Sequence, residues 1–314
     1  MMDISISNLV VDIEISSHCN ANCYFCPRDS VPLLKHIELS VCEKVLDRLD
    51  ALPVRPRLTF CGTGDSSVHP DIIFIVGRAV TRGYEVELVT NGIVVDRVFA
   101  EKLVNAGLQK ISFSITEMGA AYEAIYKFPF ERIVDNVLEF RKAAQEKCEL
   151  RIHLIKELVS NRRLGKAREF WESKGIHHIL FLDYTNRAGL LSLNNVDLDD
   201  GSFLKELRPH GVNGICPVPF KFIHIGADGT YYLCSHDFSR RVAFGHVSTH
   251  TIFESLALKL AYFQGDTAFC QSCTNFLANQ AFKKVKAGAS HQQTRMVMQH
   301  FESQVIKLVE DLAE

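Results

Sequence analysis

Residues 9–26 are Leu-Val-Val-Asp-Ile-Glu-Ile-Ser-Ser-His-Cys-Asn-Ala-Asn-Cys-Tyr-Phe-Cys. The apolar run at 9–15 predicts a first strand. Three cysteines follow within eight residues, in the pattern Cys-x3-Cys-x2-Cys. Three thiolates on one tight loop can hold three irons of a [4Fe–4S] cube. A structural zinc site or buried free thiols are the alternatives, although structural zinc usually has four protein ligands.

Short apolar segments alternate with amphipathic helical segments along the first 190 residues or so, at intervals of about 25–35 residues. This alternation is typical of repeated βα units and a parallel sheet. After the first strand, five more are predicted, at residues 57–60, 85–89, 110–115, 149–155 and 178–183. Ser40 and Glu43 form the pattern of a capping box, which predicts a helix from there to about Leu52.

The pattern changes beyond about residue 190. Residues 194–201 are rich in Asn and Asp, which predicts a linker. Ala-Asp-Gly-Thr at 227–230 lies between two apolar segments and predicts a β-hairpin. A helix is expected near 252–263, and a second amphipathic helix, packed on the core, is expected to end the chain.

Composition excludes several classes of protein. The 314 residues include 35 Lys+Arg and 37 Asp+Glu, so no strong positive charge is available to grip nucleic acid. The first residues lack the basic and apolar regions of a signal peptide, and the longest apolar run, 72–76, is too short to span a membrane. A cytoplasmic protein with no nucleic-acid or membrane partner is expected. Its ten cysteines then indicate metal or redox chemistry rather than disulfides.

The first cysteine motif resembles the signature of the radical S-adenosylmethionine (SAM) superfamily. Gly62-Thr63-Gly64-Asp65 resembles that family's Gly-Gly-Glu loop, with an aspartate where glutamate is usual, and Thr90-Asn91-Gly92 matches the end of its third strand. The resemblance implies a partial (β/α)6 barrel over residues 1–189 and a [4Fe–4S] cluster on Cys19, Cys23 and Cys26. It also implies that SAM is bound by Phe25, Gly62, Gly64, Asp65, Thr90, Asn91 and Ser114.

A second set of four cysteines lies late in the chain, at positions 216, 234, 270 and 273. Four thiolates suit either a closed [4Fe–4S] site or structural zinc, and the residues alone leave both open. The spacing Cys-x17-Cys, with Asp-Gly in the hairpin and a later Cys-x2-Cys, looks like the auxiliary-cluster module called SPASM or Twitch. That resemblance implies a small module at 190–314, with a β-hairpin and helices. It also implies a second [4Fe–4S] cluster on Cys216, Cys234, Cys270 and Cys273.

The resemblance implies chemistry in which reductive cleavage of SAM yields a 5′-deoxyadenosyl radical that abstracts a hydrogen atom. The short four-cysteine module is similar to that of aminocyclitol dehydrogenases and epimerases of aminoglycoside pathways. We expect oxidation of a hydroxyl-bearing carbon of a sugar-like or aminocyclitol-like molecule in natural product biosynthesis. Epimerisation of a sugar or of a peptide α-carbon is the alternative, and a non-catalytic zinc protein is a third. The first strand begins near residue 9, with no room before it for a leader-binding domain, which favours a small substrate over a peptide.

Two further residues are catalytic candidates, and an electron donor of flavodoxin or ferredoxin type is the expected partner. Cys61, at the end of the second strand, is a candidate hydrogen-atom donor, with a buried structural thiol as the alternative. Arg187 follows the sixth strand, at the end of the barrel where parallel strands carry their chemistry. It is a candidate to orient or deprotonate a substrate radical, and a salt link to the second module is the alternative.

Overall fold

The structure is a computed structural model, and it describes residues 3–156, 160–193, 198–265 and 267–313. The six strands expected from the sequence are all present. They are β1 Val10–Ile13, β2 Arg57–Phe60, β3 Val86–Thr90, β4 Lys110–Ser114, β5 Glu149–Ile155 and β6 Ile179–Leu182. Each pairs in parallel with the next, so the helices between them must cross over from one strand to the next.

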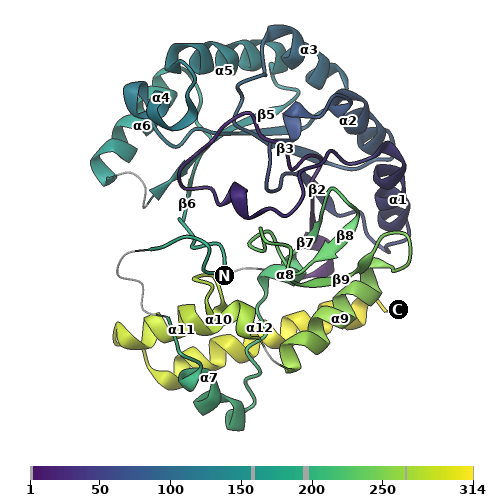
Figure 1. The fold of residues 1–314 in the computed structure, drawn as a ribbon, viewed down its shortest axis with the longest axis vertical. Coiled ribbons are helices and arrows are strands. Elements are labelled where there is room, and N and C mark those ends of the chain that lie inside the picture. Colours follow the sequence, from purple (N-terminus) through teal and green to yellow (C-terminus); the bar gives the residue numbers. More distant parts are fainter. Residues whose placement is uncertain (1–2, 157–159, 194–197, 266, 314) are drawn as a thin grey trace.

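The crossover helices lie along the outside of this curved sheet, as Figure 1 shows. They are α1 Leu39–Asp50, α2 Ile72–Thr81, α3 Arg97–Asn105, α4 Gly119–Tyr126, α5 Phe130–Ala144 and α6 Asn161–Ser173. The described strands form a nine-stranded sheet in the order β6-β5-β4-β3-β2-β1-β7-β8-β9. The predicted α/β architecture with a partial barrel is confirmed.

The predicted hairpin is present, but it is not separate from the barrel sheet. Strand β7 Phe222–Ile225 pairs in parallel with β1, and β8 Thr230–Tyr232 and β9 Ala243–His246 follow antiparallel. Every residue of β1 is buried, so the backbone of β1 needs hydrogen-bonding neighbours on both edges. The division of the chain at 189/190 stays a prediction. Within the predicted linker, residues 194–197 lie outside the described residues.

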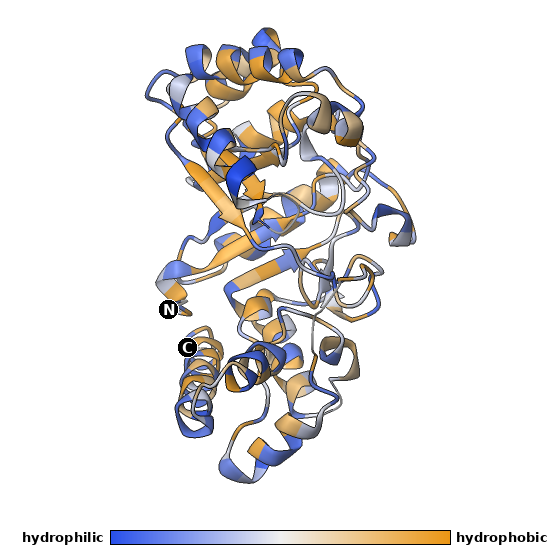
Figure 2. Ribbon diagram, turned by 90° about the vertical axis from the view of Figure 1, so that its left-hand side faces the viewer, coloured by the Kyte–Doolittle hydropathy of each residue, from blue (hydrophilic) through white to orange (hydrophobic). Residues whose placement is uncertain are grey.

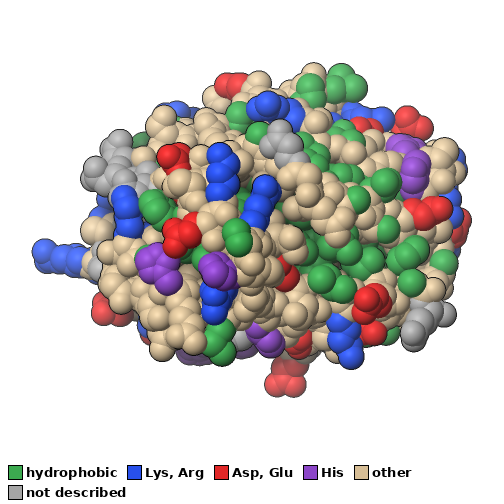
Figure 3. Space-filling view, turned by 90° about the horizontal axis from the view of Figure 1, so that it is seen from below, with side chains coloured by type: hydrophobic (Ala, Val, Ile, Leu, Met, Phe, Trp, Pro, Cys, Tyr) green, Lys and Arg blue, Asp and Glu red, His purple; other side chains and the backbone are tan. Residues whose placement is uncertain are grey.

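The C-terminal helices gather on the far side of the hairpin from α1–α6 (Figure 1). They are α7 Ser202–Leu207, α8 Val218–Lys221, α9 Ile252–Gln264, α10 Ala268–Gln271, α11 Leu277–Lys286 and α12 His291–Asp311. Helix α9 begins with a capping box, in which Thr251 and Glu254 cap each other's backbone N–H. The predicted core-facing stripe of α12 is confirmed, because Val305 and Leu308 are buried. Figure 3 shows apolar side chains among charged ones on the face seen from below.

The capping box predicted at Ser40 is wrong. Helix α1 begins at Leu39, and Ser40 lies within its first turn without a capping role. The carboxylate of Glu43 instead accepts from Arg78, at 2.7 and 3.0 Å, and from Arg82, at 2.5 Å. These ion pairs join α1 to α2. The carboxylate of Glu43 is therefore held by arginines rather than by the backbone N–H that a capping box requires.

The two faces of the sheet differ in polarity. The strands are largely hydrophobic in Figure 2, and Leu58, Phe60 and Leu88 are buried against the helices. The opposite face lines the barrel and is polar: Ser112 donates to Glu87 at 2.5 Å, and Arg151 lies 3.6 Å from Glu87. Partly buried charge of this kind is costly unless it is paired. The pairing indicates a barrel interior built to hold polar groups. None of the described helices is both long enough and apolar enough to cross a bilayer.

Candidate active site

The three-cysteine loop follows β1 and is closed by hydrogen bonds. The N–H of Cys26 donates to the carbonyl of Cys23 at 3.0 Å. The guanidinium of Arg28 donates to the carbonyls of Cys19 at 2.9 Å and of Ala21 at 2.8 Å. These contacts fold the loop back on itself, and all three thiols are partly buried.

The thiols of this loop act on one another electrostatically. Burial, with smaller contributions from the neighbouring Cys26 and Cys19, raises the pKa of Cys23 to about 12. Burial also raises the pKa of Cys19 and of Cys26. The raised pKa values mean that these thiols become thiolates only with a positive charge nearby. A bound metal cation supplies that charge and deprotonates them, so the loop suits metal ligation. The donor set fits three corners of a [4Fe–4S] cube, with the fourth iron open.

Asp65 joins the loops that follow β1, β2 and β3. Its buried carboxylate accepts from the N–H of Ser67 at 2.9 Å, from the hydroxyl of Thr90 at 2.9 Å and from the N–H of Asn91 at 2.7 Å. The side chain of Asn91 in turn donates to the sulfur of Cys19 at 3.8 Å. The structure thus brings together Asp65, Thr90, Asn91 and Cys19, four of the residues expected from the sequence. Contact between Asp65 and SAM stays a prediction.

Glycine is required at two positions of the loop after β2. A Cβ at Gly64 would lie 2.3 Å from the carbonyl oxygen of His18 and 2.4 Å from the carbonyl carbon of Ser17. A Cβ at Gly62 would lie 2.5 Å from the Cγ of Glu14. The loop after β2 therefore packs directly on the backbone that leads into Cys19, and any larger residue forces the two loops apart.

Glu14, just past β1, is a buried residue beside the site that the sequence analysis missed. It is fully buried and accepts from the N–H of Thr63 at 2.8 Å, from the N–H of Ala227 at 3.1 Å and from Arg240 at 2.5 Å. It therefore ties the loop after β2 to the β7–β8 hairpin. The sequence did offer a signal for Glu14, since it is a carboxylate within the apolar run at 9–15. A charge buried in a strand needs a specific partner.

Phe25 and Ser114 lie on the same side of the barrel as the cysteine loop. Phe25 packs edge-on against Tyr24, with ring centroids 5.2 Å apart. Ser114, the last residue of β4, hydrogen-bonds the hydroxyl of Tyr126, whose pKa is raised by burial and by nearby Cys23. Their predicted contacts with SAM stay predictions.

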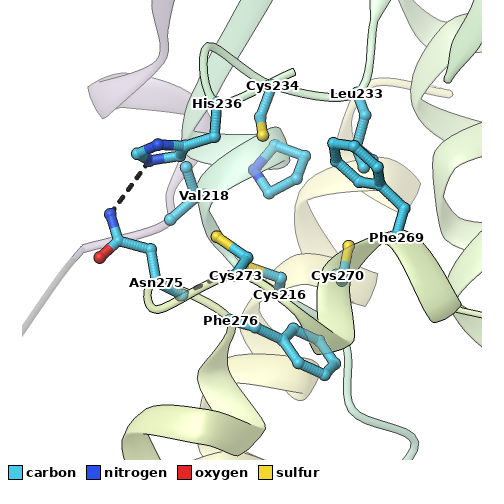
Figure 4. A pocket seen from close by; sticks show the side chains of 11 residues that line it. Cys216, Val218, Leu233, Cys234, His236, Phe269, Cys270, Cys273, Asn275 and Phe276 are labelled. Atoms are coloured by element: carbon cyan, nitrogen blue, oxygen red, sulfur yellow. Dashed lines mark hydrogen bonds between the residues drawn. The ribbon is translucent and has the colours of Figure 1, made fainter. Parts of the chain in front are cut away.

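The four late cysteines line one cavity (Figure 4). All four are buried, with 6–7% of each residue exposed. Backbone N–H groups aim at their sulfurs: those of Val218 and Leu277 at Cys216, and those of Asn275 and Phe276 at Cys273. N–H···S contacts stabilise thiolates, so this donor set fits a metal centre that the protein ligates completely. In the part of the chain that is described, no three Cys, His, Asp or Glu side chains are grouped so as to hold a single metal ion.

The loop after β6 connects this cavity to the barrel. Asn186 donates to the carbonyl of Ser272 at 2.6 Å and accepts from the N–H of Thr274 at 3.0 Å. The N–H of Ala188 points at the sulfur of Cys273. Arg187 and Ala188 both have left-handed backbone, with φ of 47° and 53°, a strain that only surrounding contacts maintain.

The side chain of Arg187 lies between the two sets of cysteines. Burial lowers the pKa of its guanidinium, and the thiols of Cys26, Cys234, Cys273 and Cys61 all oppose that shift. One terminal nitrogen is 3.5 Å from the Nδ1 of His236, which lines the cysteine cavity. Arg187 thus faces the three-cysteine loop, the cavity of the four late cysteines and Cys61 together.

Cys61 contacts a carboxyl group inside the barrel. Its thiol is hydrogen-bonded to Asp12 of β1, and burial with this contact raises the pKa of the thiol well above its usual value. Burial also raises the pKa of Asp12 to about 7, despite hydrogen bonds from Thr59 and Cys61. Asp12 was another residue that the sequence analysis missed, and together with Cys61 it forms a hydrogen-bonded pair at the end of β2.

Comparison with known proteins identifies the fold of this site. Residues 13–162, from the end of β1 into α6, match the model of the radical SAM superfamily. These residues form a radical SAM domain. That family implies one [4Fe–4S] cluster and SAM as cofactors, and the matched residues contain the three-cysteine loop.

Two curated relatives match parts of this chain. The AdoMet-dependent heme synthase of Methanosarcina barkeri is 29% identical over 185 residues, or 56% of this chain and 51% of the relative. The GTP 3′,8-cyclase of Chlorobaculum tepidum is 32% identical over 108 residues, or 33% of this chain and 32% of the cyclase. The chain spans about half of the first relative's length and a third of the second's.

Solved structures match over most of the chain. The structure of anSMEcpe with bound AdoMet has a TM-score of 0.61 at 16% identity, covering 96% of this chain and 99% of that one. The structure of BtrN in complex with AdoMet and 2-DOIA has a TM-score of 0.51 at 17% identity, covering 90% and 91%. At these identities the likeness concerns the fold alone.

Proposed function

We propose that this radical SAM enzyme removes a hydrogen atom from a hydroxyl-bearing carbon and oxidises that carbon to a carbonyl. The proposed substrate is a sugar-like or aminocyclitol-like small molecule. The observation that carries the proposal is the cavity of four buried cysteines, joined to the barrel through Arg187. Four thiolates leave no iron of a [4Fe–4S] cube free for substrate, so such a site is suited to electron transfer rather than to substrate binding.

The cysteines and the strand-end loops would hold the cofactors. Cys19, Cys23 and Cys26 would ligate the radical cluster, and Cys216, Cys234, Cys270 and Cys273 the auxiliary cluster. The loops joined by Asp65 would bind SAM beside the open iron. When bound, these groups would supply a 5′-deoxyadenosyl radical and an acceptor for one electron. An external one-electron donor of flavodoxin or ferredoxin type would supply the reducing electron.

The chain's own residues have separate roles in this oxidation. The substrate loses two hydrogens in all: one as a hydrogen atom from carbon, the other as a proton from the hydroxyl and an electron. Arg187 would orient the hydroxyl, because its guanidinium faces both cysteine sites. Glu14 and Asp65 would keep the loops around it in place through their backbone contacts.

Epimerisation is the second candidate, and the position of Cys61 favours it. An epimerase must return a hydrogen atom to the carbon, and a thiol is a suitable donor. Cys61 lies at the end of β2 with its pKa raised by burial and Asp12, so it stays a protonated thiol. Reloading that thiol after use would consume one electron and one proton, the electron coming from the external donor class named above.

Turnover in heavy water separates the two reactions. A panel of aminocyclitols and hydroxyl-bearing sugars is incubated anaerobically with SAM and reductant in D₂O, and products are weighed by mass spectrometry. Oxidation predicts a product two mass units lighter than the substrate, with no deuterium on the reacting carbon. A product that gains one deuterium there, with loss of turnover in Cys61→Ala, would replace oxidation by epimerisation.

The matched control for Cys61 is Cys148→Ala. Cys148 is also buried, but it lies beside Glu149 at the start of β5, at the opposite end of the strands. The oxidation proposal predicts that both variants keep product formation. It is contradicted if neither an oxidised nor a deuterated product forms although 5′-deoxyadenosine accumulates with every compound.

A further inference from the structure

Lys259 is a buried lysine that has no role in the proposed oxidation. It lies on α9, on the face that also carries Leu256 and Phe263, and its residue is 0% exposed. Within the described part of the chain, its ammonium nitrogen has no hydrogen-bond partner. An ammonium group buried without a partner costs several kcal/mol, so a compensating negative charge is required nearby.

Helix α9 packs next to the four-cysteine cavity, because Phe263 on the same face of α9 lies 5.9 Å from the ring of Phe220, whose neighbour Pro219 lines that cavity. Burial lowers the pKa of Lys259 to about 7, and the thiol of Cys234, one of the cavity's four, opposes that shift. The neighbouring His224 offers no negative charge: burial, with a smaller contribution from Lys259, lowers its pKa to about 4. Glu14, a carboxylate that acts on His224, is already occupied by Arg240 and two backbone N–H groups.

We propose that the ammonium of Lys259 is the fixed positive charge that balances the auxiliary cluster and raises its reduction potential. This inference rests on the cluster of the proposed function. A [4Fe–4S] cluster with four thiolates is anionic and gains one more negative charge on reduction. A cation beside Cys234 therefore stabilises the reduced form more than the oxidised form. The same cation makes the auxiliary site the better acceptor for the electron that leaves the substrate.

The test isolates the auxiliary cluster in the full-length chain. Replacing Cys19, Cys23 and Cys26 together by alanine removes the radical cluster, and iron content then reports on the auxiliary site alone. In that background, Lys259→Met and Lys259→Gln remove the charge, and Lys259→Arg keeps it. Lys283→Met on α11 is the matched control, because Lys283 is exposed and water screens its charge. The readout is the midpoint potential from a dithionite titration followed by electron paramagnetic resonance.

The proposal predicts that both neutral variants shift the equilibrium at least tenfold toward the oxidised cluster, which is about 59 mV for one electron. Lys259→Arg and Lys283→Met are expected to match the background. Loss of iron in both neutral variants, with iron retained in Lys259→Arg, also supports charge compensation. An unshifted potential in the neutral variants overturns the role of Lys259. Loss of iron in Lys259→Arg together with the neutral variants also overturns it. Absence of iron from the background chain overturns the auxiliary cluster itself, which is a separate failure.

Discussion

Replacing Asp65 is expected to weaken folding and SAM binding by separable amounts. Asp65→Ala leaves the buried N–H groups of Ser67 and Asn91 without their acceptor. Each unsatisfied donor costs about 1–3 kcal/mol, so we expect a loss of roughly 2–6 kcal/mol in the free energy of unfolding. Asp65→Asn keeps one acceptor oxygen and is expected to lose less. Asp71→Ala, an exposed carboxylate six residues on, is the control, with a change within about 0.5 kcal/mol.

Two measurements on these variants separate the roles of Asp65. Urea unfolding without SAM gives the structural loss, and equilibrium titration with SAM gives the binding loss. If the carboxylate meets the SAM ammonium, Asp65→Asn loses a charge-assisted hydrogen bond, about 1.5–3 kcal/mol or roughly one to two decades of affinity. Asp65→Asn that binds SAM as tightly as the parent refutes the ammonium contact and leaves Asp65 a purely structural hub.

Three further perturbations test the site. Cys23→Ala is expected to abolish reductive SAM cleavage, and continued 5′-deoxyadenosine formation, measured by chromatography, would contradict the ligand assignment. Gly64→Ala is expected to lower both iron content and SAM cleavage, because its Cβ would meet backbone at 2.3 Å; Gly77→Ala, with open space around it, should leave both unchanged. Asp12→Asn tests the raised pKa of about 7. The stability that protonated Asp12 contributes is fully present below the pKa of Asp12 in the unfolded chain, near 4. It is lost as the pH rises through the folded pKa of about 7, so the free energy of unfolding falls by up to about 4 kcal/mol. Urea unfolding of parent and variant should therefore differ in pH dependence between pH 4 and 8, and equal slopes would count against the assignment.

The sequence predicts the barrel well because its signals are local. The apolar segments at 57–60 and 149–155 are strands with the predicted bounds, since strand periodicity and flanking turns are written into adjacent residues. The capping box at Ser40 failed because Glu43 found Arg78 and Arg82, which lie on another helix. A competing partner from a distant segment is invisible to a pattern of four residues.

The sequence predicts only those residues of the site that lie in short sequence motifs. The four late cysteines line one cavity, the three thiols of the first loop act on one another, and Asp65 hydrogen-bonds Thr90 and Asn91. Three buried residues were missed because the group that each one faces lies far along the chain. Glu14 faces Ala227, Asp12 faces Cys61, and Lys259 faces Cys234. A buried charge on an apolar face marks such a position, but the sequence does not say which group it faces.

The two-cluster architecture is the central claim, and metal analysis of the anaerobically purified chain tests it most directly. Iron and acid-labile sulfide are measured in the parent and in a variant with Cys216, Cys234, Cys270 and Cys273 all replaced by alanine. Two [4Fe–4S] clusters predict about eight irons and eight sulfides per parent chain, and about four of each in the variant. About four irons in both proteins, or zinc in place of the second set of irons, would contradict the claim.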